Sequence, residues 1–221
     1  MTDIATYFKN KDLLELALTH KSWVNEHSKV RESNERLEFL GDAILEFIVS
    51  EYIFTLFPDK EEGYLTALRA NLVNTKNLAE VAQKLNLGKK IYLSKGEEEG
   101  GGRTNRSILA DTVEATIGAL FLDGGIIMAK KFIKTNLLDD VQSKTTQPLK
   151  DAKSRLQEFV QAKGLRAPTY KVVSETGPDH NKSFTLEVVV DGGSWAKGVG
   201  KNKGEAAQDA AENALKNNNI E

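Results

Sequence analysis

Cysteine is absent from this 221-residue sequence, and proline, methionine and tryptophan are scarce, with four, two and two residues. Without cysteine, the chain has no disulfide bonds and no thiolate metal site, which suits a reducing compartment. Charged residues interrupt the apolar runs well short of the ~18 residues that a membrane-spanning helix needs. The first residues also lack the basic stretch and apolar core of a signal peptide. We therefore expect a cytoplasmic protein with no membrane partner.

An excess of charge of either sign is missing as well. The net charge is -2, and the charged fraction of 28% and hydrophobic fraction of 40% are typical of a globular protein. Up to Lys150 the chain has 20 basic and 22 acidic residues, and after it 10 of each. Bulk charge therefore gives no argument for a polyanionic partner, and any nucleic-acid surface must come from local patterning.

The first part of the chain, residues 1–143, has the periodicity of an all-helical domain. We expect one helix capped by Asp12 and a long one capped by Ser33 or Asn34 and ended by Pro58. Further helices are expected over residues 66–73, 76–85, 108–122 and 127–141, the third of them capped by Ser107. The stretch 97–103 is rich in glutamate and glycine, which predicts an exposed loop.

The second part of the chain has a different rhythm. Residues 144–151 are polar and predict a linker, and residues 152–219 predict an α+β module of order αβββα. Its helices are expected at 152–163 and 204–215, and its strands at 170–173, 184–190 and 194–199. The last helix is rich in alanine, which suits close packing on a sheet.

Three carboxylates in the long helix are the first candidate functional residues. Glu35, Glu38 and Asp42 are spaced i, i+3 and i+7, so they project along one face. The rest of this helix is apolar almost all round, which predicts a buried helix without a lysine or arginine on the acidic face. Because a buried carboxylate is costly without a partner, a bound cation is the obvious candidate.

A second pair of carboxylates, Asp111 and Glu114, stands at i, i+3 on a later helix. Small residues accompany both sets, Gly41 in the first helix and Ala115 and Gly118 in the second, and would allow a close approach. Glu38, Asp42, Asp111 and Glu114 could then form one oxygen-rich site for Mg²⁺ or Mn²⁺. The alternative for Asp111 and Glu114 is an ordinary solvated face.

Several motifs together resemble a known family. The strongest is NERLEFLGD at residues 34–42, which resembles the ribonuclease III signature, with ALTHKS at 17–22 and SILADTVEA at 107–115 in the family's order. The second part resembles a double-stranded RNA-binding domain through LQE at 156–158, PTY at 168–170, GPDH at 177–180 and GVG at 198–200. The resemblance covers nearly the whole chain.

The resemblance implies a homodimeric endonuclease in which each subunit cuts one strand of a duplex RNA. Hydrolysis would leave a 5′-phosphate and a 3′-hydroxyl with a short 3′ overhang, on ribosomal RNA precursors and structured mRNAs. By position, the metal ligands would be Glu38, Asp42, Asp111 and Glu114, with Asp42 and Glu114 catalytic and Mg²⁺ as cofactor, which Mn²⁺ could replace. Glu35 and Glu62 would support the cleavage site. Phe39 would face the partner subunit, whereas its other interpretation is an ordinary core aromatic.

The resemblance also assigns RNA contacts in the second part of the chain. Minor grooves would be met by Ser154, Gln157, Glu158 and His180, and phosphates by Lys201, Asn202 and Lys203. This sequence departs from the family in having Gly204 where a second lysine is usual. We therefore expect weaker binding and a shallower salt dependence.

Some residues and functions keep two interpretations. His20 and His27 suggest a general base but also suit a structural role. Arg103 and Arg106 either touch RNA or keep a loop soluble. The run Glu97–Glu99 suits a solvated loop better than the alternative, a metal site. A duplex-RNA-binding protein that no longer cuts is the main rival to the nuclease, although retention of all four mutually repelling carboxylates argues against it. A phosphohydrolase of small nucleotides is disfavoured by the second module.

Overall fold

The computed structural model describes residues 3–139, 141, 151–178 and 182–220. The chain divides into two compact units, Met1–Gln147 and Pro148–Glu221, which are described separately. The linker expected at residues 144–151 lies outside the described residues, apart from Asp151.

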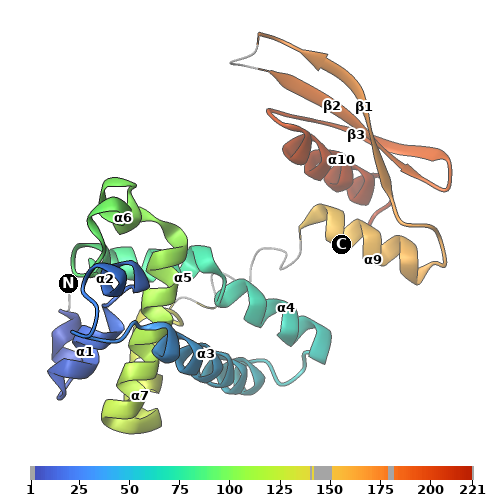
Figure 1. Ribbon diagram of the computed structural model, residues 1–221. Helices are drawn as coiled ribbons and strands as arrows, with labels where there is room; N and C mark the ends of the chain where they lie inside the picture. Colours follow the sequence, from blue (N-terminus) through green and yellow to red (C-terminus); the bar gives the residue numbers. More distant parts are fainter. Residues whose placement is uncertain (1–2, 140, 142–150, 179–181, 221) are drawn as a thin grey trace. The chain divides into compact units, whose positions relative to one another are not determined.

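The first unit is helical (Figure 1). Its longer helices are α1 (Lys11–Ala17), α2 (Lys21–Glu26), α3 (Glu35–Leu56), α4 (Glu62–Leu72), α5 (Thr75–Lys84), α6 (Lys95–Glu99) and α7 (Arg106–Asn136). Short 3₁₀ turns are η1 (Ile4–Tyr7), η2 (Leu87–Lys89) and η3 (Gly102–Thr104). The expected all-helical domain is therefore confirmed, with α2 and α6 added to the helices that the periodicity predicted.

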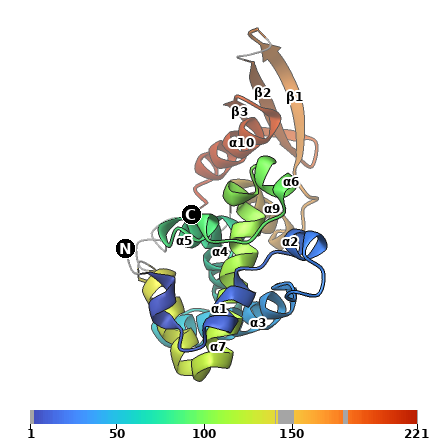
Figure 2. The same ribbon diagram turned by 60° about the vertical axis from the view of Figure 1, so that its left-hand side comes forward.

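Helix α7 runs through the middle of this unit, and α1, α3 and α5 pack against it (Figures 1 and 2). Gly125 interrupts α7 with a φ of 68°, at the point where two separate helices were expected. Within the described residues, α7 is the one helix long and apolar enough to cross a membrane, with half of its most apolar window buried in the protein. Its packing against three other helices identifies it as the core helix of the unit.

The two helices that carry the candidate acids approach each other at glycine. A Cβ atom at Gly41 of α3 would lie 1.7 Å from the Glu114 carbonyl oxygen of α7, and one at Gly118 would lie 2.3 Å from the Leu37 carbonyl oxygen. Any larger residue would separate the backbones, so the predicted role of small residues in bringing α3 and α7 together is confirmed.

Helix α3 is not buried all round, as its composition had indicated. One stripe of aromatic side chains faces outward, with Phe39, Phe47 and Phe54 exposed to 82%, 62% and 71%. These positions are spaced by eight and seven residues, which places them on one helical face. Nothing among the described residues of the single chain covers this stripe.

Three details of the helix boundaries and loops were also predicted wrongly. The side chain of Asn10, not Asp12, caps α1, and the side chain of Asn105, not Ser107, caps α7. Residues 97–103 are not an open loop, because α6 and η3 form there and the Arg103 guanidinium donates to the carbonyl oxygens of Gly88 and Ile91. These internal hydrogen bonds give Arg103 a structural role.

The second unit is an αβββα module, as expected. Strands β1 (Thr169–Thr176), β2 (Ser183–Val190) and β3 (Gly193–Gly200) form an antiparallel sheet of order β1-β2-β3. Helices α9 (Ala152–Ala162) and α10 (Lys203–Asn217) lie on the same face of the sheet (Figures 1 and 2). Close packing of the alanine-rich helix is confirmed, since a Cβ at Gly198 would lie 2.0 Å from the Ala210 backbone nitrogen.

Candidate active site

The acidic helix α3 is anchored at its first residues to the segment before it. Asn34 is buried, and its side chain donates to the Ala17 carbonyl oxygen at 3.0 Å instead of capping α3. Its backbone N–H donates to the Thr19 carbonyl oxygen at 2.9 Å. This double attachment fixes the start of α3, and with it the position of Glu38 one turn later.

Three carboxylates from two helices meet at one place. Glu38 of α3 and Asp111 and Glu114 of α7 each offer an oxygen, and these oxygens all lie within 4.8 Å of one another. All three side chains are partly buried. Asp42 is exposed one turn beyond Glu38, but its charge still raises the pKa of both Glu38 and Glu114.

The shared environment disfavours ionisation of the cluster. Burial is the largest cause that raises the pKa of Glu114 to about 7, and repulsion from Asp42, Asp111 and Glu38 adds to it. Burial also raises the pKa of Glu38, with Asp111 next, and burial raises the pKa of Asp111. Carboxylates that repel one another in a partly dry site either keep a proton or bind a cation among them.

The donor set fits a hard divalent cation. Closely spaced carboxylate oxygens, with room on the exposed side for water, are the ligands that Mg²⁺ and Mn²⁺ prefer. A soft metal would require the sulfur or imidazole ligands that this cluster lacks. Glu38, Asp111 and Glu114 would hold such a cation, whereas Asp42 lies outside this set of three oxygens and acts on Glu38 and Glu114 through its charge.

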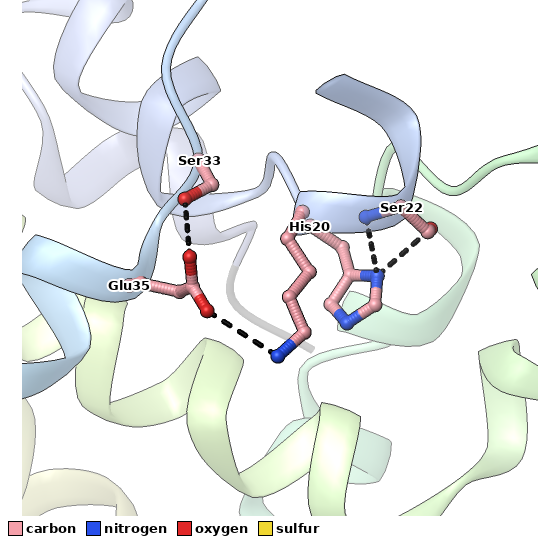
Figure 3. A network of polar contacts seen from close by, with 5 residues as sticks. His20, Ser22, Ser33 and Glu35 are labelled. Atoms are coloured by element: carbon pink, nitrogen blue, oxygen red, sulfur yellow. Dashed lines mark hydrogen bonds and ion pairs between the residues drawn. The ribbon is translucent and has the colours of Figure 1, made fainter. Parts of the chain in front are cut away.

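Glu35 stands apart from these three oxygens, contrary to the expectation that no basic residue would serve the acidic face. Its carboxylate accepts from the Ser33 hydroxyl at 3.0 Å and from the Lys21 ammonium at 3.3 Å (Figure 3). These two donors, Ser33 before Lys21, lower the pKa of Glu35. The lysine comes from α2, so inspection of α3 alone could not have found it.

Glu62 also lies outside the cluster. It begins α4, and its carboxylate accepts from the Thr66 hydroxyl at 2.8 Å. It lines a pocket of about 490 Å³ between α3 and α4, together with the exposed Phe47 and Phe54. Phe39, for which a contact with the partner subunit and a place in the core were the two interpretations, is exposed and is not a core aromatic of the single chain.

Two further residues at the edge of the cluster have defined roles. The Nδ1 atom of His20 accepts from the Ser22 backbone N–H and caps α2, so the histidine has the structural role that was one of its two interpretations. Glu97 is partly buried at the start of α6, and its charge acts on His20. Sequence patterning had placed Glu97 in a solvated loop because its neighbours are glutamate and glycine.

The predicted RNA contacts of the second unit fall at two helix starts. On α9, Ser154 donates to the Asp151 carboxylate, and Gln157 and Glu158 are exposed. On α10, Asn202 is the cap and its side chain exchanges hydrogen bonds with Glu205. Lys201 and Lys203 are exposed beside it. His180 lies outside the described residues.

Comparisons with known proteins match both units. A ribonuclease-III-like family model matches residues 10–141, and a double-stranded RNA binding motif matches residues 152–218. The Ribonuclease 3 of Streptococcus pyogenes serotype M3 is 46% identical over 97% of this chain and 94% of its own length, and that of serotype M28 is 45% identical over the same shares.

Solved structures are similar to the first unit. A nuclease-domain structure of ribonuclease III from Campylobacter jejuni is 44% identical, covers 66% of this chain and 95% of its own, and has a TM-score of 0.56. A second structure of that domain, which describes structural flexibility in a region involved in dimer formation, is 45% identical with a TM-score of 0.55, over 61% of this chain and 96% of its own.

Proposed function

The chain belongs to the ribonuclease III family and is an endoribonuclease of double-stranded RNA, and we propose that Glu38, Asp42, Asp111 and Glu114 bind Mg²⁺ at its cleavage site. The observation that carries this proposal is the approach of three carboxylate oxygens from α3 and α7 to within 4.8 Å. Mn²⁺ offers the same coordination chemistry and can substitute.

The protein's contribution to the reaction is to position charge. Glu38, Asp111 and Glu114 are held on two helices that touch at glycine, so their oxygens need little rearrangement on binding a cation. Asp42 and Glu114 are the groups that we assign to the chemistry, Asp42 from its place in the family's motif and Glu114 also because burial and its neighbours raise its pKa to about 7. Mg²⁺, when bound, would supply activation of the attacking water and neutralisation of charge on the phosphodiester.

Membership of the family supports the same products for this chain. We assign it hydrolysis to a 5′-phosphate and a 3′-hydroxyl with a short 3′ overhang, on ribosomal RNA precursors and structured mRNAs. Glu35 and Glu62 are assigned supporting roles at the cleavage site. The cytoplasm is the compartment in which these RNAs and a cysteine-free protein are expected together.

The active form that we propose is a homodimer. Phe39 and two residues of the pocket between α3 and α4, Phe47 and Phe54, are exposed in the single chain, and burial of large apolar side chains is what a second copy would provide. A relative's dimer-forming region, in the Campylobacter jejuni nuclease domain, supports this assignment. Glu62 lines the same pocket and would lie at the interface.

The second unit is assigned the task of holding the duplex. Residues 152–219 form this domain and residues 144–151 the linker that joins it to the nuclease domain, residues 1–143. Ser154, Gln157, Glu158 and His180 would meet the minor groove, and Lys201, Asn202 and Lys203 the phosphates. The positive end of the α10 helix dipole, at its N-terminus, favours phosphate as well.

A cleavage assay on a long labelled RNA duplex tests the metal site. We expect the parent to cut in Mg²⁺, and Glu114→Gln to bind the duplex in Ca²⁺ with unchanged affinity but to cut at least roughly 100-fold more slowly, the usual effect of removing one catalytic group. Glu98→Gln is the matched control, because Glu98 is an exposed acid paired with Arg103. A Glu114→Gln variant that cuts like the parent would remove the carboxylate cluster from the mechanism.

A further inference from the structure

Lys21 lies at the exposed edge of the acidic cluster. Its ammonium is 3.3 Å from one oxygen of Glu35, and its side chain is 63% exposed. Its positive charge acts to lower the pKa of Glu35, Glu38 and Asp111. Lys21 is therefore a cation at the edge of the carboxylate cluster, with more than half of its side chain open to solvent and to a polyanionic substrate.

The backbone on both sides of Lys21 is fixed. The backbone N–H of His20 donates to the Tyr92 carbonyl oxygen at 3.1 Å, and the hydroxyl of Ser22 accepts from the Ser94 backbone N–H at 3.0 Å. His20 also caps α2, in which Lys21 is the first residue. The backbone of Lys21 is therefore held in place, and only its side chain can move.

The pairing of Lys21 with Glu35 leaves the ammonium available. An ammonium has three donors, and Glu35 uses one of them. An ion pair between two side chains that are more than half exposed is weak and is easily exchanged. Glu35 also accepts from the Ser33 hydroxyl (Figure 3), so its carboxylate would keep one donor if the lysine turned to another acceptor.

We propose that Lys21 is a substrate-positioning residue, whose ammonium binds a phosphate of the cleaved RNA strand next to the acidic cluster. This inference rests on the proposed function. Carboxylates that hold a cation also repel the neighbouring phosphates of the strand, and a fixed positive charge at the edge of the cluster offsets that repulsion. The lysine would thus hold the strand in register with Glu38, Asp111 and Glu114.

The alternative role of Lys21 is to neutralise Glu35, and a double-mutant cycle separates the two. We would compare the parent with Lys21→Gln, Lys21→Arg, Glu35→Gln and the double variant Lys21→Gln/Glu35→Gln. Duplex binding is measured in Ca²⁺ over a series of salt concentrations, and single-turnover cleavage in Mg²⁺. Lys11→Gln is the control, because Lys11 is an exposed lysine that also begins a helix.

We expect Lys21→Gln to weaken duplex binding roughly three- to tenfold and to reduce the slope of log Kd against log salt by about 0.9 for each phosphate that the lysine binds. The same changes should appear in the Glu35→Gln background, Lys21→Arg should restore most of the binding, and Lys11→Gln should match the parent. Thermal midpoints should stay close to that of the parent, since the pair is exposed.

Two results would overturn the proposal. One is an unchanged salt slope in Lys21→Gln, and the other is disappearance of its effect once Glu35 is glutamine, which would leave only the neutralising role. A parent that fails to cut duplex RNA at all is a different outcome, because it would refute the proposed metal site and not the assignment of Lys21 alone.

Discussion

At the scale of single residues, Glu114 makes the nuclease domain sensitive to pH. Its pKa is about 7 in the folded chain against 4.5 as the ordinary value, because burial and three neighbouring carboxylates oppose its charge. Between these two values, the folded state holds a proton that the unfolded state has released. Without metal, stability is therefore highest at low pH within this window and falls as the pH rises towards 7.

This sign gives a calorimetric prediction. In EDTA, we expect the nuclease domain of the full chain to unfold at a higher temperature at about pH 5.5 than at about pH 7.5, and we expect Glu114→Gln to reduce that difference. Saturating Mg²⁺ should reverse the trend, because metal competes with the proton and binds best above the pKa. Identical pH dependence of the parent and Glu114→Gln in EDTA would contradict the raised pKa.

The approach of the three carboxylates is the feature of the candidate site that follows most directly from residue spacing. Spacing places Glu38, Asp111 and Glu114 on helical faces, and the neighbouring glycines predicted that these faces could touch. The ion pair between Glu35 and Lys21 could not be predicted from helical spacing, since Lys21 precedes Glu35 by 14 residues and belongs to another helix. Contacts that depend on the tertiary path of a loop leave no periodic signal in a sequence.

At the scale of elements, the contact between α3 and α7 sets the geometry of the site. A methyl group at Gly41 would meet the backbone of Glu114, which cannot move without shifting α7. We expect Gly41→Ala to lower the free energy of unfolding by roughly 1–3 kcal/mol, the usual cost of overpacking, and to weaken Mg²⁺ binding. Denaturant unfolding and metal titration of the same protein would measure both effects.

Gly63 provides the control for this substitution. It lies in α4, and among the described residues no atom beyond its chain neighbours and the backbone of its own helix is within 4 Å of the position of its missing Cβ. Gly63→Ala should therefore raise the free energy of unfolding by about 0.5–1 kcal/mol, because alanine is the better helix former. If Gly41→Ala also stabilised the protein, α3 and α7 would not be in the close contact described.

Helix α10 carries the departure from the family's usual lysine pair. A Cβ at Gly204 would lie 3.2 Å from Asn202 Oδ1, a side-chain atom, so a longer residue can be accommodated with a small adjustment. We expect Gly204→Lys to tighten duplex binding several-fold and to steepen the salt dependence by about 0.9 per additional phosphate bound. Filter binding over a salt series would measure this change.

A lysine at the other end of the same helix is the matched control. Asn217 is exposed in the last turn of α10, so Asn217→Lys adds the same charge far from the helix N-terminus. Equal effects of the two substitutions would show that net charge, and not a phosphate bound at the start of α10, determines the affinity.

Elements were predictable where their pattern is regular and their packing is simple. The strands β2 and β3 and the alanine-rich helix α10 were predicted to within two residues at each end, whereas the prediction for β1 covered only residues 170–173 of Thr169–Thr176. Helix α6 was missed because glutamate and glycine dominate its sequence, whereas Ser94 caps it and Arg103 ties the following turn to Gly88 and Ile91. Tertiary hydrogen bonds override weak local propensity in such a segment.

At the scale of the whole molecule, the aromatic stripe of α3 is a large apolar surface that the described residues of the single chain leave exposed. Composition predicted burial of the entire helix, whereas the structure buries one side of it and leaves the face with Phe39, Phe47 and Phe54 exposed. Sequence periodicity reports that a residue will be buried but not by which chain. The prediction of burial and the observed exposure agree if a second copy covers this face, which is the dimer proposed above.

Substitution of Phe39 tests that dimer directly. Because Phe39 is 82% exposed, Phe39→Asp should leave the fold of the single chain intact while placing a charge in the proposed interface. We expect sedimentation equilibrium to show that the dissociation constant of the dimer rises at least roughly tenfold, a loss of about 1.4 kcal/mol of association free energy. The rate of duplex RNA cleavage should fall in proportion to the fraction of dimer. Val30→Asp, at an apolar residue exposed to 68% in the loop before α3, should do neither. A Phe39→Asp protein that remains dimeric and active would place the subunit contact elsewhere and leave the aromatic stripe without a partner.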